Sequence, residues 1–260
     1  MDIAHAVSGF LVGLLVGLTG VGGGSLMAPV LILIFGVAPA TAIGTDLWFA
    51  AITKSIGGTI HHAKNSADLK VVRRLMTGSI PAAVVTLVVL NAMHWSQLKQ
   101  GWLPIALGLV LLATAIATVV RPRIHRWILA RRSEGRLPGA RHQAPMTILA
   151  GAILGVLVTL TSVGAGALGA TMLVFLYPLR LGAKRIVGTD IVHAIPLTVV
   201  AGIGHLLIGS VDGMLLLNLL IGSIPGIVIG SLLVHKVSEK LVRYALSVVL
   251  VFTGARLMVV

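Results

Sequence analysis

The stretch LTGVGGGSLMAPVLILIFG, from Leu18 to Gly36, places four glycines within five residues inside an apolar run. A second stretch, LTSVGAGALGATMLVFLYP from Leu160 to Pro178, has its own glycine-rich interruption. Glycine inside a helix costs about 1 kcal/mol relative to alanine. Each stretch is therefore predicted to form two short helices separated by a break, and the sequence raises the question of what the break does.

The chain around these stretches has the composition of a membrane protein. Its 260 residues are 57% hydrophobic and 10% charged, with a mean hydropathy of +1.05. Soluble domains carry about 25% charged residues, and a membrane-spanning helix needs about 20 apolar ones. There is no cysteine, which excludes disulfides, thiol catalysis and cysteine-ligated metal. The net charge of +13 comes from basic residues gathered in loops, which favours membrane topology over nucleic-acid binding.

Ten apolar segments follow one another, five on each side of a basic stretch. That stretch, Arg121 to Arg141, carries seven arginines and one glutamate and is predicted to be cytoplasmic. The N-terminus lacks a basic start and is expected to be a retained membrane segment, not a signal peptide. The expected division is a first membrane repeat (1–120), a basic cytoplasmic linker (121–145) and a second membrane repeat (146–260). The apolar segments are 3–18, 22–36, 41–62, 71–91, 102–120, 146–160, 166–178, 186–208, 213–234 and 240–259.

The two halves repeat in sequence at a nearly constant offset of 142 to 144 residues. The longest block, LMTGSIPA from Leu75, matches LLIGSIPG from Leu219 with five of eight residues identical. Agreement across separate blocks indicates an internal duplication. The other matches are Val21-Gly22-Gly23-Gly24 with Val163-Gly164-Ala165-Gly166, Gly44-Thr45-Asp46 with Gly188-Thr189-Asp190, His61 with His205, and Asp68 with Asp212.

The loop charges predict that the two halves are inverted. Basic loops at 64–74, 180–185 and 235–240 are placed in the cytoplasm, together with the linker. Loops 36–40, 92–101 and 209–212 then lie outside, as do both termini. An odd number of elements in each half produces the inversion.

The first two segments of each half are predicted to be short. They contain 13 to 16 residues, which is about 20–24 Å of helix against a hydrocarbon core of about 30 Å. Each pair is either two tilted spans or a re-entrant hairpin with the glycine break at its tip. Irregular backbone at that depth is tolerated only where it is buried in protein or lines a cavity.

The breaks are candidate anion sites because the helix that follows each break begins with unpaired N–H groups. Hydroxyl donors lie beside them, and two inverted breaks would meet near the midplane as in secondary transporters. The alternative is that the glycines only permit close helix packing. The candidate substrate-binding residues are Thr19, Gly22, Gly23, Gly24, Ser25, Lys54, Thr161, Ser162, Gly164, Ala165 and Gly166.

Two of the seven acidic residues, Asp46 and Asp190, occupy matched positions after Gly-Thr. One reading is a carboxylate at a helix N-terminus, with Thr45 or Thr189 as the cap. The other is a group that orients the break or carries a proton.

Lys54 and His193 are ionisable residues inside predicted spans, where such residues are costly and often functional. Lys54 could pair with Asp46, attract an anion or line a vestibule, and its repeat partner is the uncharged Thr198. His193 lies one turn after Asp190 and could carry a proton or be a hydrogen-bonded core histidine. His61 and His205 fall near segment ends and are expected at the interface. Pro81 and Pro225 are expected to kink the fourth elements.

No nucleotide-binding, metalloprotease or serine-hydrolase motif is present in the sequence, and the glycines are not followed by the Gly-Lys-Ser/Thr of a P-loop. No cofactor, metal or nucleic acid is therefore expected as a partner. The expected partners are a small anion, the lipid bilayer and protons.

The glycine breaks with Pro29 downstream, and the paired Gly-Thr-Asp motifs, resemble the TauE/SafE sulfite exporter family, also called the 4-toluene sulfonate uptake permease family. The resemblance covers essentially the whole chain. It implies transport of a sulfur-containing anion such as sulfite, a sulfonate or sulfoacetate. The second break departs from the first by having Ala165 for Gly23 and Ala167 for Ser25.

Together these observations predict an all-α integral membrane protein with two inverted repeats of about five helical elements, in which Gly-broken short helices form hairpins. The expected function is secondary transport of a small sulfur-containing anion across the bacterial inner membrane, by export coupled to the proton gradient. Asp46, Asp190 and His193 are the candidates for coupling or for orienting the breaks. An anion channel and a membrane-embedded enzyme are the alternatives.

Overall fold

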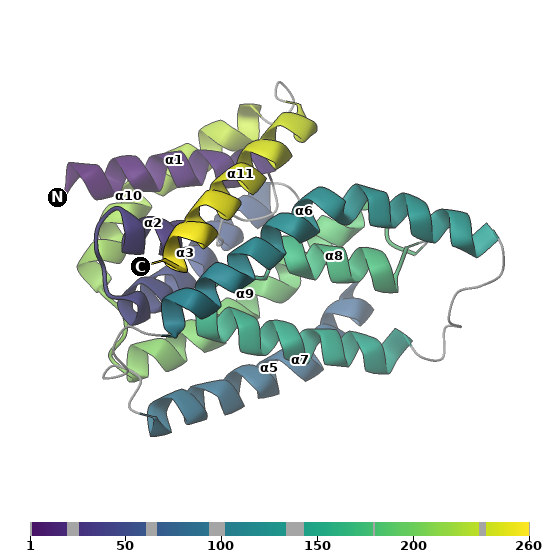
Figure 1. The fold of residues 1–260 in the computed structure, drawn as a ribbon, viewed down its shortest axis with the longest axis horizontal. Helices are drawn as coiled ribbons and strands as arrows, with labels where there is room; N and C mark the ends of the chain where they lie inside the picture. Colours follow the sequence, from purple (N-terminus) through teal and green to yellow (C-terminus); the bar gives the residue numbers. More distant parts are fainter. Residues whose placement is uncertain are drawn as a thin grey trace.

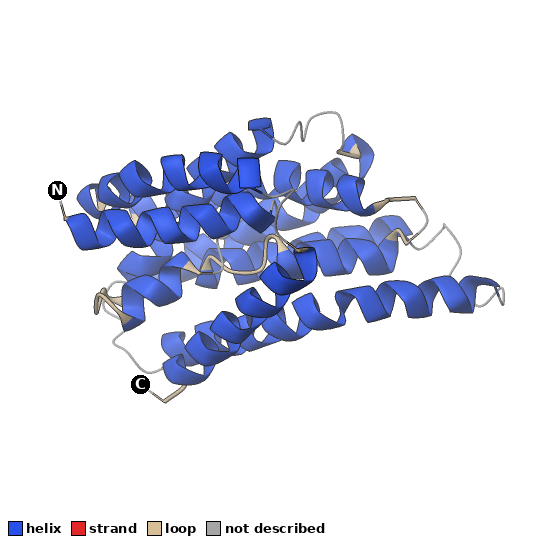
Figure 2. Cartoon of the chain, turned by 90° about the horizontal axis from the view of Figure 1, so that it is seen from above, coloured by secondary structure: helices blue, strands red, loops and turns tan. Residues whose placement is uncertain are grey.

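The computed structural model is helical throughout its described part, which comprises residues 2–19, 26–60, 67–93, 102–133, 143–178, 180–233 and 238–259. Figure 2 shows only helices and connecting loops there. This confirms the predicted all-α class. The ten helices are α1 (Ile3–Thr19), α2 (Met27–Leu33), α3 (Pro39–Ile60), α5 (Leu69–Ala92), α6 (Leu103–Ser133), α7 (Gln143–Thr161), α8 (Ala167–Leu176), α9 (Ala183–Leu207), α10 (Gly213–Leu233) and α11 (Glu239–Leu257).

Five of these helices contain stretches long and apolar enough to cross a membrane, in α5, α6, α7, α9 and α10. The second element of each half is short as predicted, with 7 residues in α2 and 10 in α8. The prediction that α7 is also short is wrong, because it has 19 residues, or about 28 Å of helix. The fifth element is longer than predicted as well, since α6 continues through Pro122 to Ser133 inside the expected linker.

The surface of the bundle is apolar where a soluble protein would be polar. Val85 and Val88 of α5 are 62% and 64% exposed, and Val248 and Phe252 of α11 are 68% and 66% exposed. Surfaces of this kind are stable against lipid and unfavourable in water. The polar residues are instead gathered inside, with Thr45, Asp46, Lys54, Asp190 and His193 each at most 3% exposed.

Helices of one half pack mainly on helices of the other half, and they do so reciprocally. The first element of each half lies against the fourth element of the other, which pairs α1 with α10 and α7 with α5. The third elements α3 and α9 pack together at the centre, and the fifth elements α6 and α11 also meet. Two halves related by a two-fold axis produce this pattern of contacts.

Glycines allow these pairs to approach closely, with matching residues in each pair. A side chain added at Gly13 of α1 would overlap the carbonyl of Ser223 in α10, and one added at Gly155 of α7 would overlap the carbonyl of Ser79 in α5. The matches Gly13–Gly155 and Ser79–Ser223 follow the repeat offsets found in the sequence. Small residues spaced four apart are the usual means of close packing between membrane helices.

The orientation of the helices agrees with the predicted inversion, although the membrane sides of the loops stay a prediction. In Figure 1, α1 and α7 run in opposite directions across the molecule. Both termini lie at one end, and the end of α6 and the start of α7 lie at the other. The basic linker thus leaves the bundle at the end opposite the termini.

Because Gly155 is in contact with the Ser79 carbonyl, we expect Gly155→Ala to destabilise the folded protein by about 1–3 kcal/mol through overpacking. The matched change Gly13→Ala should have a similar effect. Thermal unfolding in detergent measures both. Gly213→Ala is the control, since a methyl group there meets no atom within 4 Å. Equal melting temperatures for all three variants would contradict this account of the packing.

Candidate functional site

The break between α7 and α8 is a tight, buried turn formed by residues with unusual backbone angles. Ser162 has a φ of 58°, and Gly164 and Gly166 have φ values of 123° and 122°. Values near +120° are accessible in practice only to glycine. The Thr161 hydroxyl supports the turn, because it donates to the Leu157 carbonyl at 2.6 Å and accepts from the Val163 N–H at 3.2 Å. Thr161 was predicted to donate to a ligand, and its proton is used here within the chain.

The start of α8 faces a carboxylate of α9. Gly166 caps α8 without a side-chain hydrogen bond, and the Gly169 N–H donates to the Gly164 carbonyl at 3.1 Å. The Asp190 carboxylate faces the Gly166 amide. It also lies so close to Gly169 that a methyl group there would overlap its Oδ1 atom. Asp190 is only 2% exposed, so a negative group is held against the positive end of α8.

Lys54 of α3 reaches the same break from the other half of the chain. Its Nζ donates to the Ala165 carbonyl at 3.2 Å, and the side chain is 3% exposed. The ammonium group also faces Asp46 and Asp190. One buried cation therefore donates to a peptide carbonyl, and its charge acts on two nearby carboxylates.

Asp46 is fully buried and lies opposite the break. Its carboxylate faces the Ser162 hydroxyl and the Ala28 amide. Within the described residues, however, neither of its oxygens makes a hydrogen bond, and the Ser162 Oγ also has no partner. Unpartnered groups at such depth are costly, and they are typical of sites that receive a ligand or a proton.

The reading of Asp46 and Asp190 as helix N-terminal carboxylates is wrong. The helices α3 and α9 begin at Pro39 and Ala183, about two turns before these residues. The preceding threonines do not cap either helix. The Thr45 hydroxyl accepts from the Asp212 N–H at 3.1 Å, and the Thr189 hydroxyl accepts from the Asp68 N–H at 3.0 Å. Each Gly-Thr-Asp motif thus joins the break region to the start of a helix in the opposite half.

Two histidines of α9, His193 and His205, are buried and hydrogen-bonded. His193 Nε2 lies 2.9 Å from the Ser79 hydroxyl, one turn along α9 from Asp190. His205 was expected at the interface, but it is fully buried and its Nε2 lies 2.9 Å from the Thr159 carbonyl. Ser79 belongs to the repeated Gly-Ser-Ile-Pro block, in which the sequence predicts a role only for the proline.

The structure therefore brings Lys54, Asp46 and Asp190 together with the second break. His193 lies one turn away, and Gly164 is surrounded by the apolar side chains of Leu168, Val158 and Leu154. The remaining candidates fall in the first break and lie outside the described residues. They are Gly22, Gly23, Gly24, Ser25 and the side chain of Thr19. His61, which follows α3, also lies outside the described residues.

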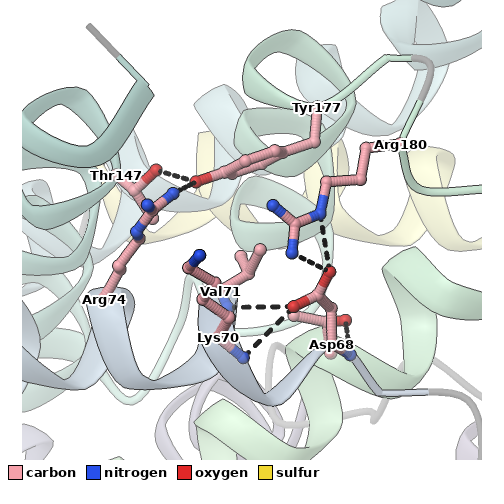
Figure 3. A network of polar contacts seen from close by, with 8 residues as sticks. Asp68, Lys70, Val71, Arg74, Thr147, Tyr177 and Arg180 are labelled. Atoms are coloured by element: carbon pink, nitrogen blue, oxygen red, sulfur yellow. Dashed lines mark hydrogen bonds and ion pairs between the residues drawn. The ribbon is translucent and has the colours of Figure 1, made fainter. Parts of the chain in front are cut away.

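A second polar cluster lies at one end of the molecule, near the start of α5 (Figure 3). Asp68 caps α5 by accepting from the Lys70 and Val71 amides, and its other oxygen binds Arg180 Nε at 2.8 Å. The Arg180 guanidinium lies 5.8 Å from the centre of the Tyr177 ring. Asp212, which matches Asp68, is exposed, and positions 36 and 38 in the first half carry glycine and alanine where the second half has Arg180.

Tyr177 connects the rest of this cluster. Its hydroxyl accepts from Arg74 at 3.1 Å and lies 2.7 Å from the Thr147 hydroxyl (Figure 3). The ends of α5, α7 and α8 are therefore joined by side chains at one end of the bundle.

A multi-pass helical bundle with a buried polar site at a broken helix defines a membrane transporter. Comparison with known proteins gives the family. The sulfite exporter TauE/SafE family model matches residues 5–257, and the chain belongs to this family. This confirms the resemblance found in the motifs and the assignment to the inner membrane as a multi-pass protein.

Two curated relatives are both from Bacillus subtilis (strain 168). The chain is 40% identical to the probable membrane transporter protein YjnA over 222 residues, which cover 84% of this chain and 85% of the relative. It is 25% identical to the probable membrane transporter protein YdhB over 217 residues, which cover 81% of each chain. No solved structure matches the chain.

Because Gly169 is in contact with Asp190, we expect Gly169→Ala to destabilise the protein by about 1–3 kcal/mol. The loss should be smaller when Asp190 is also replaced by alanine, which gives a coupling energy in a double-mutant cycle. Thermal unfolding of the four proteins provides the measurement. Gly182→Ala is the control, since nothing lies within 4 Å of a methyl group there. Strictly additive effects would contradict the contact between these two residues.

We also expect Arg180→Gln to lower stability by about 1–2 kcal/mol, because it leaves the buried Asp68 carboxylate without its charged donor. In a protein that already carries Asp68→Asn, Arg180→Gln should have little further effect on stability. Arg185→Gln, on the exposed face of α9, provides the control. The idea fails if the Arg180 and Arg185 variants unfold at the same temperature.

Proposed function

We propose that this protein is a secondary transporter that moves a small sulfur-containing anion, of the sulfite, sulfonate or sulfoacetate type, across the bacterial inner membrane. Export is the direction that the family's name suggests, and we propose that it is coupled to the proton gradient. The observation that carries the proposal is the convergence of Lys54, the Ser162 hydroxyl and the start of α8 on one buried break.

The anion would be bound mainly by peptide groups. A sulfite or sulfonate group presents three acceptor oxygens, which match backbone N–H groups at the break from Gly164 to Gly166. The Ser162 hydroxyl, which has no hydrogen-bond partner among the described residues, would donate to a further oxygen, and Lys54 would supply positive charge. Thr161 could take part only by releasing the Leu157 carbonyl. By repeat symmetry, residues Gly22 to Ser25 with Thr19 would form the second part of the site.

The acidic residues would couple transport to the movement of a proton or orient the break. Asp46, whose oxygens make no hydrogen bond among the described residues, is suited to take up a proton. Asp190 holds the start of α8, and His193 with Ser79 could pass a proton along the same face of α9. One half moving against the other would expose the break to each side in turn. The hydrogen bonds from Asp68 and Asp212 to Thr189 and Thr45 would connect this motion to the loops.

Anion binding to the purified protein tests the proposal. We expect one sulfur anion from a panel of sulfite, sulfate, thiosulfate, taurine and sulfoacetate to raise the melting temperature, with acetate as the comparison. At a concentration of about 100 times Kd, the stabilisation is about 2.7 kcal/mol. Lys54→Gln should abolish it and Ser162→Ala should weaken binding by about 0.5–1.5 kcal/mol. Ser247→Ala, which removes a hydroxyl bonded within α11, should not change it.

Stabilisation by no anion would overturn the proposal, and the glycines would then serve packing. Counterflow in proteoliposomes distinguishes a transporter from a channel. A transporter preloaded with unlabelled anion accumulates labelled anion transiently, because one site is exposed alternately to the two sides. A channel shows no such accumulation.

A further inference from the structure

The N-terminal end of α8 already holds a carboxyl group that belongs to the protein. Asp190 is 2% exposed, its carboxylate faces the Gly166 amide, and its Oδ1 lies against Gly169 in the first turn. Within the described residues this Oδ1 atom makes no hydrogen bond. The carboxylate is therefore held there by the positive helix end and by the charges of nearby cations, and among the described residues its Oδ1 atom has no hydrogen bond to lose if it moves.

The charges around Asp190 are few. Among the described residues, the cations whose charges act on it are Lys54 of α3, which also acts on Asp46, and Arg121 of α6. The helices α7 and α8 carry no ionisable side chain. The ionisable residues of α5 lie in its first two turns, at Lys70, Arg73 and Arg74 after the cap Asp68. On α9 itself, His193 is one turn away and is bonded to Ser79.

An anion that enters this site meets a carboxylate where its own oxygens should bind. Two negative groups about 4 Å apart repel each other by about 4 kcal/mol even at an effective dielectric constant of 20. Lys54 and Arg121 cannot neutralise Asp46, Asp190 and the anion at once, because two positive charges would then face three negative ones. The site can accept the anion only if one of the carboxylates leaves and loses its charge.

We propose that Asp190 is a built-in occupant of the α8 N-terminus, which the transported anion displaces, and that Asp190 takes up one proton from water as it leaves. This inference rests on the proposed function and specifies the direction in which the proton moves relative to the anion. One anion and one proton enter the site together, so that the net charge of the site does not change. The anion and the proton then move in the same direction. Export therefore proceeds only when the outward concentration gradient of the anion is larger than the inward proton gradient.

Isothermal calorimetry on the purified wild type tests the proposal. The probe is methanesulfonate, whose charge does not change between about pH 5 and pH 8, titrated in two buffers with different ionisation enthalpies. We expect the difference in heat to correspond to one proton taken up per anion. The Kd should rise roughly tenfold per pH unit wherever the empty site is unprotonated.

Variants give the second measurement. Asp190→Asn should bind methanesulfonate without proton uptake, with a pH-independent Kd at least tenfold lower than that of the wild type at pH 8. Asp212→Asn, which removes a carboxylate outside the site, should keep the proton uptake of the wild type. If Asp190→Asn does not fold, Asp46→Asn decides: it should keep the proton uptake of the wild type, and loss of the uptake there would assign the proton to Asp46 and overturn the inference.

The outcomes separate this inference from the proposed function. Binding by the wild type with no proton uptake overturns the inference and leaves anion transport in place. A folded Asp190→Asn variant that no longer binds overturns it too, because Asp190 then supports the anion. No binding of methanesulfonate, sulfite or sulfate by the wild type contradicts the proposed function itself.

Discussion

A helix that is interrupted inside a bilayer leaves peptide N–H and C=O groups where water cannot reach them, and the rest of this structure is arranged around that constraint. At the break between α7 and α8, Lys54 donates to the Ala165 carbonyl. The Thr161 hydroxyl donates to the Leu157 carbonyl and accepts from the Val163 N–H. Asp190 faces the amide end of α8. The buried polar residues are thus the partners that the broken backbone requires.

The same residues join the break, which belongs to the second half of the chain, to the first half. Lys54 comes from the first half and reaches a carbonyl of the second, so that the site exists only when the halves are packed together. Close packing at Gly13 and Gly155 fixes their separation, and the Thr45 and Thr189 hydroxyls bind amides of the opposite half. A change in the angle between the halves must therefore alter the surroundings of the break.

Much of this arrangement could be predicted from the sequence, because the duplication, the glycine breaks and the paired Gly-Thr-Asp motifs are strong local patterns. The depth of Asp46 and Asp190 could not, because the helices begin at Pro39 and Ala183 and the helix boundary depends on tertiary packing. The local use of the Thr161 hydroxyl was also hidden, since it depends on backbone angles in the break. The continuation of α6 to Ser133 was missed because a basic sequence was read as a loop.

The reciprocal contacts have a consequence for the origin of the fold. When position i of one half meets position j of the other, and j meets i in return, the two surfaces are those of an isologous dimer. A half-length chain with these surfaces would be complementary to an inverted second copy of itself. The features that break the symmetry, such as Lys54 opposite Thr198 and His193 opposite Phe49, are then differences that two separate copies of one gene could not have acquired. Fusion into a single chain is what allows one site to have two chemically different sides.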